Sequence, residues 1–338
     1  MTAVNSIASW PLSYRIVGDN PALEREFCVL LNSWGFLPVS GEHARITIVV
    51  LPAGELAASP SQGDPIVEWR GLSVRKKAEQ ISFSYRSWEM ELDLATLTFR
   101  CSGPDPDPSE RLNFREFFLL APLLVMMHRL GYFELHAAAC EYQESGYLLL
   151  GPSGSGKTTA MLSLIASGWS YLSDDAMVVS ADPEGGIAAR ALRRSFSLKP
   201  DHLERFPGLA RYATESVART NKKRLDPRQV WPGQYAPVAH PRFIVACKVV
   251  DEDTTRIRPI SRAESLARLV GSTPWLMFDR ATAPAHLEIF RSLAATCCSF
   301  ELSAGRDLFR NRDRIASLID PEVLLEEWLS INREAAWA

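Results

Sequence analysis

The chain has 338 residues, of which 46% are hydrophobic and 23% charged. These fractions are close to the globular average, which excludes a disordered or collagen-like chain, and the length predicts two domains. Lysine and arginine number 37 against 40 aspartate and glutamate residues, a net charge of −3. This balance predicts no nucleic-acid partner.

The cysteine pattern and the apolar runs predict a cytoplasmic protein without a membrane partner. The six cysteines form no CxxC pair, so we expect neither a disulfide framework nor a structural zinc site. The first residues, MTAVNSIASWPLSY, do not have the basic and apolar segments of a signal peptide. The longest apolar run, Phe117–Met127, contains Pro122 and is too short to span a bilayer.

The first hundred residues have the pattern of a small α+β domain. Apolar residues recur at helical spacing over Pro21–Trp34, which predicts a helix with one buried face. Four strand-like runs follow, some with polar and apolar residues alternating: Ile46–Leu51, Ile66–Trp69, Ile81–Tyr85 and Met90–Phe99.

A proline-rich segment marks the expected domain boundary. Three prolines within Gly103–Pro108 exclude regular structure. We therefore predict an N-terminal α+β domain at 1–102, a linker at 103–112 and a second domain at 113–338. A separate unit before a catalytic core is expected to recruit a partner or substrate.

The second region begins with the pattern of an α/β nucleotide-binding core. Asn113–Arg129 predicts a buried helix, and Phe133–Tyr142 and Gly146–Leu150 predict two strands. A glycine-rich loop, a helix from Gly156 and a strand at Trp169–Leu172 follow. This order of strand, loop, helix and strand is typical of such cores.

The glycine-rich loop matches a phosphate-binding motif. Gly151-Pro-Ser-Gly-Ser-Gly-Lys-Thr158 fits GxxxxGK[ST] at each fixed position, between a predicted strand and a predicted helix. Backbone N–H groups of such a loop and the helix N-terminus attract phosphate oxygens. We expect Lys157 to reach the β- and γ-phosphates and the Thr158 hydroxyl to ligate Mg²⁺. The full triphosphate site is expected to comprise Gly151, Pro152, Ser153, Gly154, Ser155, Gly156, Lys157, Thr158 and Thr159.

Two adjacent carboxylates end the next strand. Asp174 and Asp175 follow Leu172-Ser173, one helix and one strand beyond Lys157. We expect this strand to neighbour the loop strand, so that both acids emerge at the ligand-binding edge of the sheet. One carboxylate could hold Mg²⁺ and the other could accept the proton of an attacking hydroxyl. The alternative is a solvated turn or a helix cap.

Sequence spacing alone does not assign a role to one histidine and several lysine and arginine residues. His136 lies in a predicted apolar strand, where a histidine is usually a core residue. Lys199 follows the strand-like Ser195–Leu198 and is the best candidate to neutralise charge at a triphosphate. Further cations either grip an anion or form a solvated loop: Arg193, Arg194, Arg219, Lys222, Lys223 and Arg224.

Taken together, these motifs resemble the C-terminal catalytic domain of HPr kinase/phosphorylase. The resemblance is carried by His136-Ala-Ala-Ala, the phosphate loop and Ser167-Gly-Trp-Ser-Tyr-Leu-Ser-Asp-Asp175. It implies a P-loop kinase core related to PEP carboxykinase, which uses ATP and Mg²⁺ to phosphorylate a serine on a small protein. By position it implies Asp174 as the base, Asp175 either at the metal or orienting the site, and His136 beside the reacting phosphate.

The departures from that family favour its HprK-related branch. The glycine- and asparagine-rich segment downstream of the catalytic motifs is missing from this sequence. The branch includes peptide-tailoring enzymes such as lasso-peptide kinases, which implies a peptide or small-protein substrate rather than HPr. Homologous kinases form rings, so the resemblance also implies a homo-oligomer.

Three functional hypotheses follow. The first is an ATP- and Mg²⁺-dependent kinase acting on a hydroxyl of a peptide or small protein. The second is a small-molecule kinase for free serine or of the shikimate-kinase type, because such enzymes place an aspartate at a spacing like that of Asp174. The third is a nucleotide-binding regulatory module without phosphoryl transfer.

Overall fold

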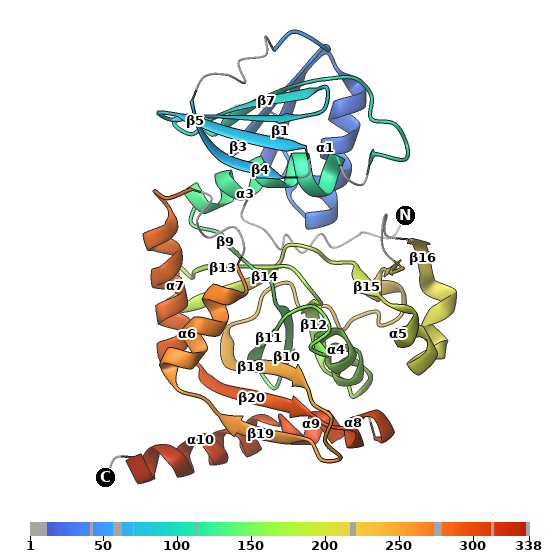
Figure 1. The fold of residues 1–338 in the computed structure, drawn as a ribbon, viewed down its shortest axis with the longest axis vertical. Helices are drawn as coiled ribbons and strands as arrows, with labels where there is room; N and C mark the ends of the chain where they lie inside the picture. Colours follow the sequence, from blue (N-terminus) through green and yellow to red (C-terminus); the bar gives the residue numbers. More distant parts are fainter. Residues whose placement is uncertain are drawn as a thin grey trace. The chain divides into compact units, whose positions relative to one another are not determined.

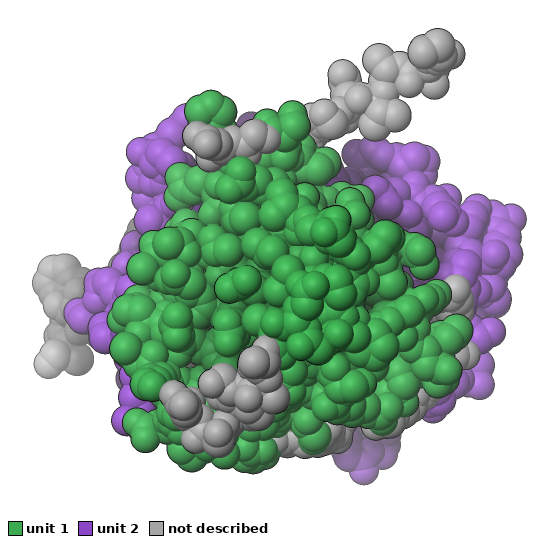
Figure 2. Space-filling model, turned by 90° about the horizontal axis from the view of Figure 1, so that it is seen from above, with its two compact units in different colours: residues 1–130 green, residues 131–338 purple. Residues whose placement is uncertain are grey.

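The structure is a computed structural model that describes residues 12–40, 43–56, 63–69, 71–111, 114–216, 221–273, 279–311 and 314–335. It divides into two compact units, residues 1–130 and 131–338 (Figures 1 and 2). Each unit combines helices with β-sheet, so the predicted α/β class is confirmed. Among the described residues, no helix is long and apolar enough to cross a membrane.

The first unit contains an eight-stranded sheet with the order β2-β1-β3-β8-β7-β6-β5-β4. Strands β1, β3 and β8 run parallel, and β8 to β4 form an antiparallel meander. The strands are β1 (Ser13–Gly18), β2 (Leu37–Pro38), β3 (Ile46–Leu51), β4 (Asp64–Trp69), β5 (Leu72–Lys77), β6 (Gln80–Tyr85), β7 (Trp88–Asp93) and β8 (Thr98–Ser102).

One predicted strand of this unit proves to be a hairpin. The expected run Met90–Phe99 is divided between β7 and β8 by a turn in which Asp93 Oδ1 accepts hydrogen bonds from the N–H groups of Ala95 and Thr96. Leu97 completes the turn with φ +49°. An aspartate that binds the backbone two residues ahead favours a turn over an extended strand.

Helix α1 (Pro21–Trp34) forms where the apolar spacing predicts it. The Asn20 side chain accepts from Leu23 N–H at its start, and Gly35 ends it in the left-handed conformation at φ +85°. Its apolar face is fully buried at Leu23, Phe27 and Leu31.

The boundary between the units lies after Leu130, and this differs from the predicted boundary at 103–112. The π-helical segment η1 (Phe114–Leu119) and helix α3 (Leu120–Arg129), expected in the second domain, belong to the first unit. Phe114 packs on Trp88 with ring centroids 4.9 Å apart, and Phe118 stacks on Tyr85 at 6.3 Å. The prolines end regular structure there, but these buried aromatic contacts keep the following helices with the first sheet.

An ion-pair cluster ties the same segment to α1. Glu26 of α1 is only 1% exposed, and its carboxylate pairs with Arg111 at 3.5 Å and with Arg115 at 2.5 Å. Removing one partner would leave a buried charge, which is strongly destabilising.

The second unit is built on a six-stranded sheet with the order β12-β10-β11-β18-β20-β19. Two three-stranded sheets, β14-β13-β9 and β15-β17-β16, adjoin it. The strands are β9 (Phe133–Leu135), β10 (Ala138–Tyr142), β11 (Ser145–Leu150), β12 (Ser170–Ser173), β13 (Met177–Ala181), β14 (Ile187–Ala191), β15 (Phe196–Leu198), β16 (Ala213–Ser216), β17 (Lys223–Leu225), β18 (Pro241–Val249), β19 (Arg256–Pro259) and β20 (Cys298–Ala304).

Helices pack on both faces of the six-stranded sheet. Successive side chains of β11 point alternately to these two faces. Tyr147 and Leu149 belong to a core with helix α4, whereas Leu148 and Leu150 belong to a separate core with α7. The helical elements are α4 (Lys157–Ala166), α5 (Pro200–Arg205), η2 (Pro207–Tyr212), η3 (Pro227–Gln229), α6 (Arg262–Gly271), α7 (Ala283–Thr296), α8 (Asp307–Arg310), α9 (Arg314–Leu318) and α10 (Pro321–Ala335).

The sequence predicts that the strand ending at the acid pair neighbours the loop strand, and this is wrong: β12 and β11 are not direct neighbours. Strand β10 lies between them, because Gln143 and Glu144 adopt positive φ and turn β10 into an antiparallel hairpin with β11. Strand β12 is also antiparallel to β10, so it runs parallel to β11. The carboxyl ends of β11 and β12 therefore still meet at one edge of the sheet.

The unit boundary generates a testable prediction. Replacing the fully buried Phe118 by alanine should destabilise the first unit by about 3–5 kcal/mol, since it removes a large core side chain. Hydrogen exchange followed by mass spectrometry should show faster exchange in peptides from residues 72–102. The matched control is Val29→Ala at a half-exposed site of α1, which should change little. Faster exchange confined to residues 131–338 would contradict this boundary.

Candidate active site

The loop between β11 and α4 has a shape that requires glycine. At Gly151, φ is +144°, and a Cβ atom would come within 2.5 Å of Ser155 Oγ and 2.7 Å of the Cys247 carbonyl oxygen. Gly156 lies at the N-cap of α4 with φ +92°. The backbone of the loop can approach a ligand closely because neither position carries a side chain.

Lys157 is anchored across this loop. Its Nζ donates to the carbonyl oxygens of Gly151 and Pro152, the latter at 3.3 Å, and the residue is only 6% exposed. Burial lowers the pKa of Lys157, and the nearby carboxylates, Asp175 foremost, act in the opposite direction. The ammonium group is thus held beside the N-terminus of α4, where two sources of positive potential add.

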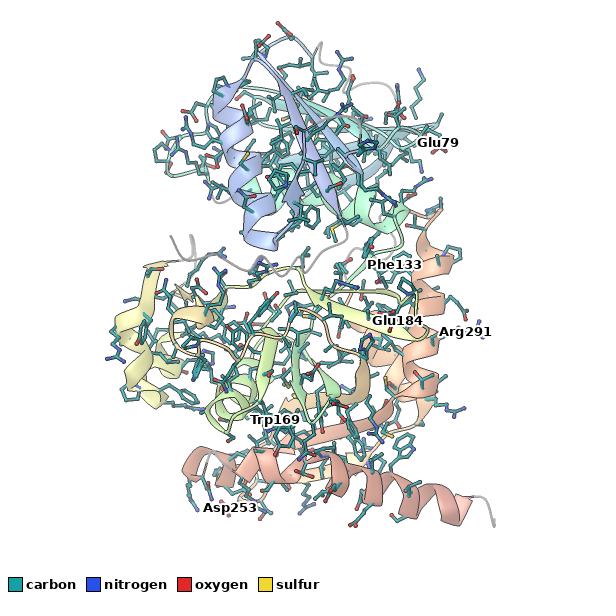
Figure 3. The ribbon with its side chains drawn as sticks, turned by 180° about the vertical axis from the view of Figure 1, so that it is seen from behind. Glu79, Phe133, Trp169, Glu184, Asp253 and Arg291 are labelled. Atoms are coloured by element: carbon teal, nitrogen blue, oxygen red, sulfur yellow. The ribbon has the colours of Figure 1, made fainter. Side chains whose placement is uncertain are left out.

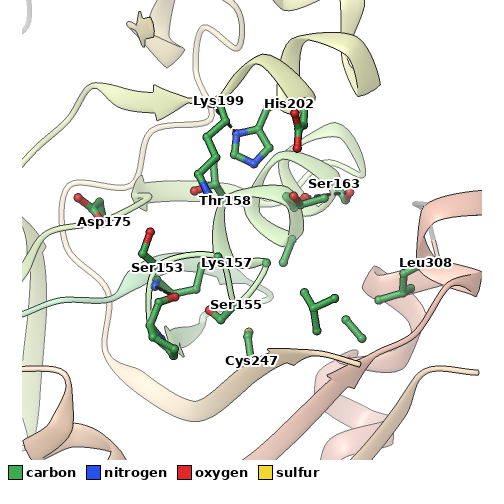
Figure 4. A pocket seen from close by; sticks show the side chains of 18 of the residues that line it. Ser153, Ser155, Lys157, Thr158, Ser163, Asp175, Lys199, His202, Cys247 and Leu308 are labelled. Atoms are coloured by element: carbon green, nitrogen blue, oxygen red, sulfur yellow. Dashed lines mark hydrogen bonds between the residues drawn. The ribbon is translucent and has the colours of Figure 1, made fainter. Parts of the chain in front are cut away.

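A cavity of about 460 Å³ lies over the loop (Figure 4). That volume is within the usual range for small-molecule sites. Of the residues expected at a triphosphate site, all but Gly151 line it. The lining also includes His136, Asp175 and Lys199, which the sequence had suggested independently.

His136 and Asp175 meet because two chain segments pass between the same two sheets. The first segment leaves β9 at Leu135 and joins β10 at Ala138, and the second leaves β12 at Ser173 and joins β13 at Met177. Strands β9 and β13 pair with each other, as do β10 and β12. The predicted continuous strand Phe133–Tyr142 is therefore broken at His136.

Three side chains form a polar cluster at this crossing. His136 Nδ1 lies 3.3 Å from Asp175 Oδ1, and Arg193 donates to Asp175 Oδ2 at 3.1 Å. The Arg193 backbone is itself anchored, because its carbonyl accepts from Ser173 Oγ at 2.7 Å and its N–H donates to Ala176 O at 3.2 Å. This network orients the Asp175 carboxylate.

Partial burial sets the charge state of His136. Burial lowers its pKa, and the Asp175 carboxylate only partly offsets this effect by raising it. The imidazole is therefore neutral at pH 7 and can accept or donate a hydrogen bond at each ring nitrogen according to its tautomer.

Asp174 occupies a different environment from Asp175. Its side chain is 1% exposed and is not part of the cavity lining, whereas the Asp175 side chain is 29% exposed. Asp174 Oδ2 accepts from Ser197 N–H at 3.0 Å, and Oδ1 has no hydrogen-bond partner within the part of the chain that the structure describes. Burial and then the charge of Asp175 raise the pKa of Asp174.

The small sheet β15-β17-β16 positions two of the candidate cations at the cavity. The antiparallel register that pairs Leu198 with Lys223 places Lys199 and Lys222 opposite each other at the strand ends, and both line the cavity. Lys223 lies within β17 and is exposed, and Arg224 donates to Ser195 Oγ at 3.2 Å. Arg219 lies outside the described residues.

The lining includes residues that sequence reasoning missed. His202 and Arg205 follow Lys199 on α5, and His202 Nδ1 accepts from Lys199 N–H at 3.1 Å. The sequence signal that could have found them is Pro200 directly after Lys199, because proline favours the first position of a helix. The apolar side of the cavity comes from distant segments and had no local signal: Cys247, Val249, Leu302, Ala304, Leu308 and Ile315.

The residues present fit a magnesium–nucleotide complex. Thr158 and Asp175, the two expected metal ligands, line the same cavity and supply oxygen donors. Mg²⁺ prefers oxygen ligands and commonly takes only one or two from the protein, the rest coming from phosphates and water. No cluster of three or more His, Cys, Asp or Glu ligands occurs among the described residues.

Comparisons with known proteins match the chain to solved structures. No protein-family model matches the chain, and no curated protein matches its sequence. Among solved structures, the chain is similar to the Hpr(Ser) kinase/phosphatase from Coxiella burnetii, with 12% identity and a TM-score of 0.30. The match covers 59% of this chain and 96% of the other.

The His136–Asp175 contact predicts the sign of a pKa change. In the protein, His136 should titrate below the ordinary histidine value, since burial disfavours its charged form. In Asp175→Asn the His136 pKa should fall further, because the negative charge that raises it is gone. NMR titration of the histidine ring signals measures both values, with His136→Gln identifying the signal. A rise in the His136 pKa in Asp175→Asn would contradict this geometry.

Proposed function

We propose that the protein is an ATP- and Mg²⁺-dependent kinase that transfers the γ-phosphoryl group to a hydroxyl, namely a serine of a peptide or small protein. The observation that carries the proposal is the composition of one cavity. A glycine loop, Lys157 and the N-terminus of α4 form one wall, and His136, Asp175 and Lys199 face the same space.

The loop side would bind the triphosphate. Backbone N–H groups of residues 153–158 and Lys157 Nζ supply donors for phosphate oxygens, and Thr158 would hold Mg²⁺. When bound, Mg²⁺ neutralises charge on the phosphates. In the structure, Lys157 Nζ donates to two carbonyl oxygens of the loop. On binding of a triphosphate, these hydrogen bonds would be replaced by hydrogen bonds to phosphate oxygens.

We assign the proton-accepting role to Asp175 in place of Asp174. A general base must come within hydrogen-bond reach of the proton that it removes, and Asp175 is the carboxylate of the pair that lines the cavity. His136 and Arg193 would hold it in position. Asp174 is then a positioning residue: its hydrogen bond to Ser197, the middle residue of β15, would hold the strand that Lys199 follows.

Lys199 and Lys222 would stabilise the charge of the transferring group. Like charges opposite each other in an antiparallel pair are unfavourable, and an anion placed between them would relieve that repulsion. Such cations act mainly by electrostatic stabilisation of the transition state.

The acceptor class rests on the sequence resemblance to HprK-related, peptide-tailoring kinases. We propose a small precursor peptide, of the lasso type, as the substrate. Free serine or another small alcohol would make the protein a small-molecule kinase, and nucleotide binding without transfer would make it a regulatory module. The assay below separates these outcomes.

The test uses the full-length protein with Mg²⁺ and γ-labelled ATP. It is offered HPr, free serine and a small precursor peptide encoded beside its gene, and the label is located by mass. We expect label on a hydroxyl of the peptide. Label on free serine alone would assign a small-molecule kinase, and bound ATP with no transferred label would contradict the kinase proposal.

The two aspartates provide the mechanistic test. Asp175→Asn should lower the transfer rate by about 10²–10⁴-fold with nucleotide affinity retained, because it removes the base. Asp174→Asn should lower it by less than about tenfold, because the amide oxygen still accepts from Ser197 N–H. Lys157→Ala is the control that should lose nucleotide binding itself. The opposite ranking of the two aspartates would return the role of base to Asp174.

A further inference from the structure

We propose that the apolar end of the cavity is the subsite for the nucleoside, and that it accepts different nucleobases with similar affinity. This inference rests on the proposed function, since it assumes that a triphosphate occupies the loop. It assigns a role to residues that the transfer chemistry does not use: Val249, Ala304, Leu308 and Ile315.

The cavity has two chemically different ends. Asp175 lies at one end and Leu308 at the other, with Ser153, Lys157 and Ser155 of the loop between them (Figure 4). Asp175, the proposed base, and His136, which contacts it, both belong to the first end. The γ-phosphate must lie there if transfer occurs, so the rest of the nucleotide extends toward Leu308.

The surface of α4 provides the path between the two ends. Thr159 and Ser163, one turn apart on this helix, both line the cavity, and so does Ala160 between them. The cavity therefore continues beyond the helix N-terminus, where phosphate contacts end, and reaches the apolar wall. That wall is formed by the ends of β18 and β20 with α8 and α9.

Two polar side chains beside the apolar wall have hydrogen-bond partners already. Ser163 Oγ donates to Thr159 O at 3.0 Å, and Cys247 Sγ donates to Val245 O at 3.6 Å. The side chains of the wall itself and those next to it are aliphatic: Ala160, Val249, Leu302, Ala304, Leu308 and Ile315. A site that hydrogen-bonds its ligand rejects a wrong analogue by about 10⁴-fold or more, whereas an apolar site discriminates far less.

The first experiment measures binding of ATP, GTP and CTP to the full-length protein with Mg²⁺, by displacement of a fluorescent nucleotide. Inorganic tripolyphosphate is measured in parallel as a ligand with no nucleoside. We expect the three nucleotides to bind within about tenfold of one another, and each more tightly than tripolyphosphate. A preference of more than about tenfold for one base would overturn the proposal, as would equal affinity for ATP and tripolyphosphate.

The second experiment uses variants at the apolar end. Leu308→Ala should weaken ATP binding by about tenfold through lost apolar contact and leave tripolyphosphate binding unchanged. Ala304→Leu, which fills the space, should act in the same direction. The matched control is Leu318→Ala, the same truncation in the same apolar core but outside the cavity lining. It should change neither affinity.

The tripolyphosphate measurements distinguish a failure of the proposed kinase function from a failure of the nucleoside subsite alone. If Lys157→Ala does not reduce tripolyphosphate binding, the phosphate loop and the proposed kinase function both fail. If tripolyphosphate depends on Lys157 but Leu308→Ala and Ala304→Leu leave ATP affinity unchanged, only the nucleoside subsite fails. Retained tripolyphosphate binding also shows that each variant is folded.

Discussion

The site depends on one constraint of β-structure: two chain segments must leave one sheet and enter another side by side. Strands β9 and β13 pair in one sheet and β10 and β12 pair in the other, so the short connections at 136–137 and 174–176 are held against each other. Neither connection can continue either ladder, and its side chains become available for other contacts. His136 and Asp175 come together for this reason. The 38 residues between them form β10, β11, α4 and β12 with their connecting loops.

The same crossing gives two adjacent aspartates opposite environments. Strand β12 ends at Ser173, and the two aspartates lie in the bend that follows it. Asp174 turns into the protein toward Ser197, and Asp175 turns toward His136 and Arg193. Burial raises the pKa of the first, while two neighbours orient the second. Environment rather than residue type thus separates a group that holds the structure from one that can take part in chemistry.

The cavity joins this crossing to parts of the chain that have little else in common. The phosphate loop supplies its centre, the small sheet β15-β17-β16 brings Lys199 and Lys222 to its lining, and α8 and α9 close the end opposite Asp175. A cavity with Asp175 at one end, Lys157 between the ends and aliphatic side chains at the other suits a ligand that is charged in one part and less polar in another. A nucleoside triphosphate has that distribution, which is why the same geometry supports both the proposed transfer and the proposed nucleoside subsite.

The sequence by itself determined the elements whose signals are local. The spacing of apolar residues predicted α1, the motif around Lys157 predicted a strand, a loop and a helix, and the pair Asp174-Asp175 indicated the edge of the sheet. Tertiary structure decided what depends on distant contacts. It placed residues 114–130 with the first unit because Phe114 and Phe118 pack there, and it inserted β10 between β11 and β12. It also selected which aspartate faces the cavity and brought Leu308 and Ile315 to it. Local patterns specify how a segment folds, whereas long-range pairing and burial specify which segments meet, and a site made from several segments is known only when that pairing is known.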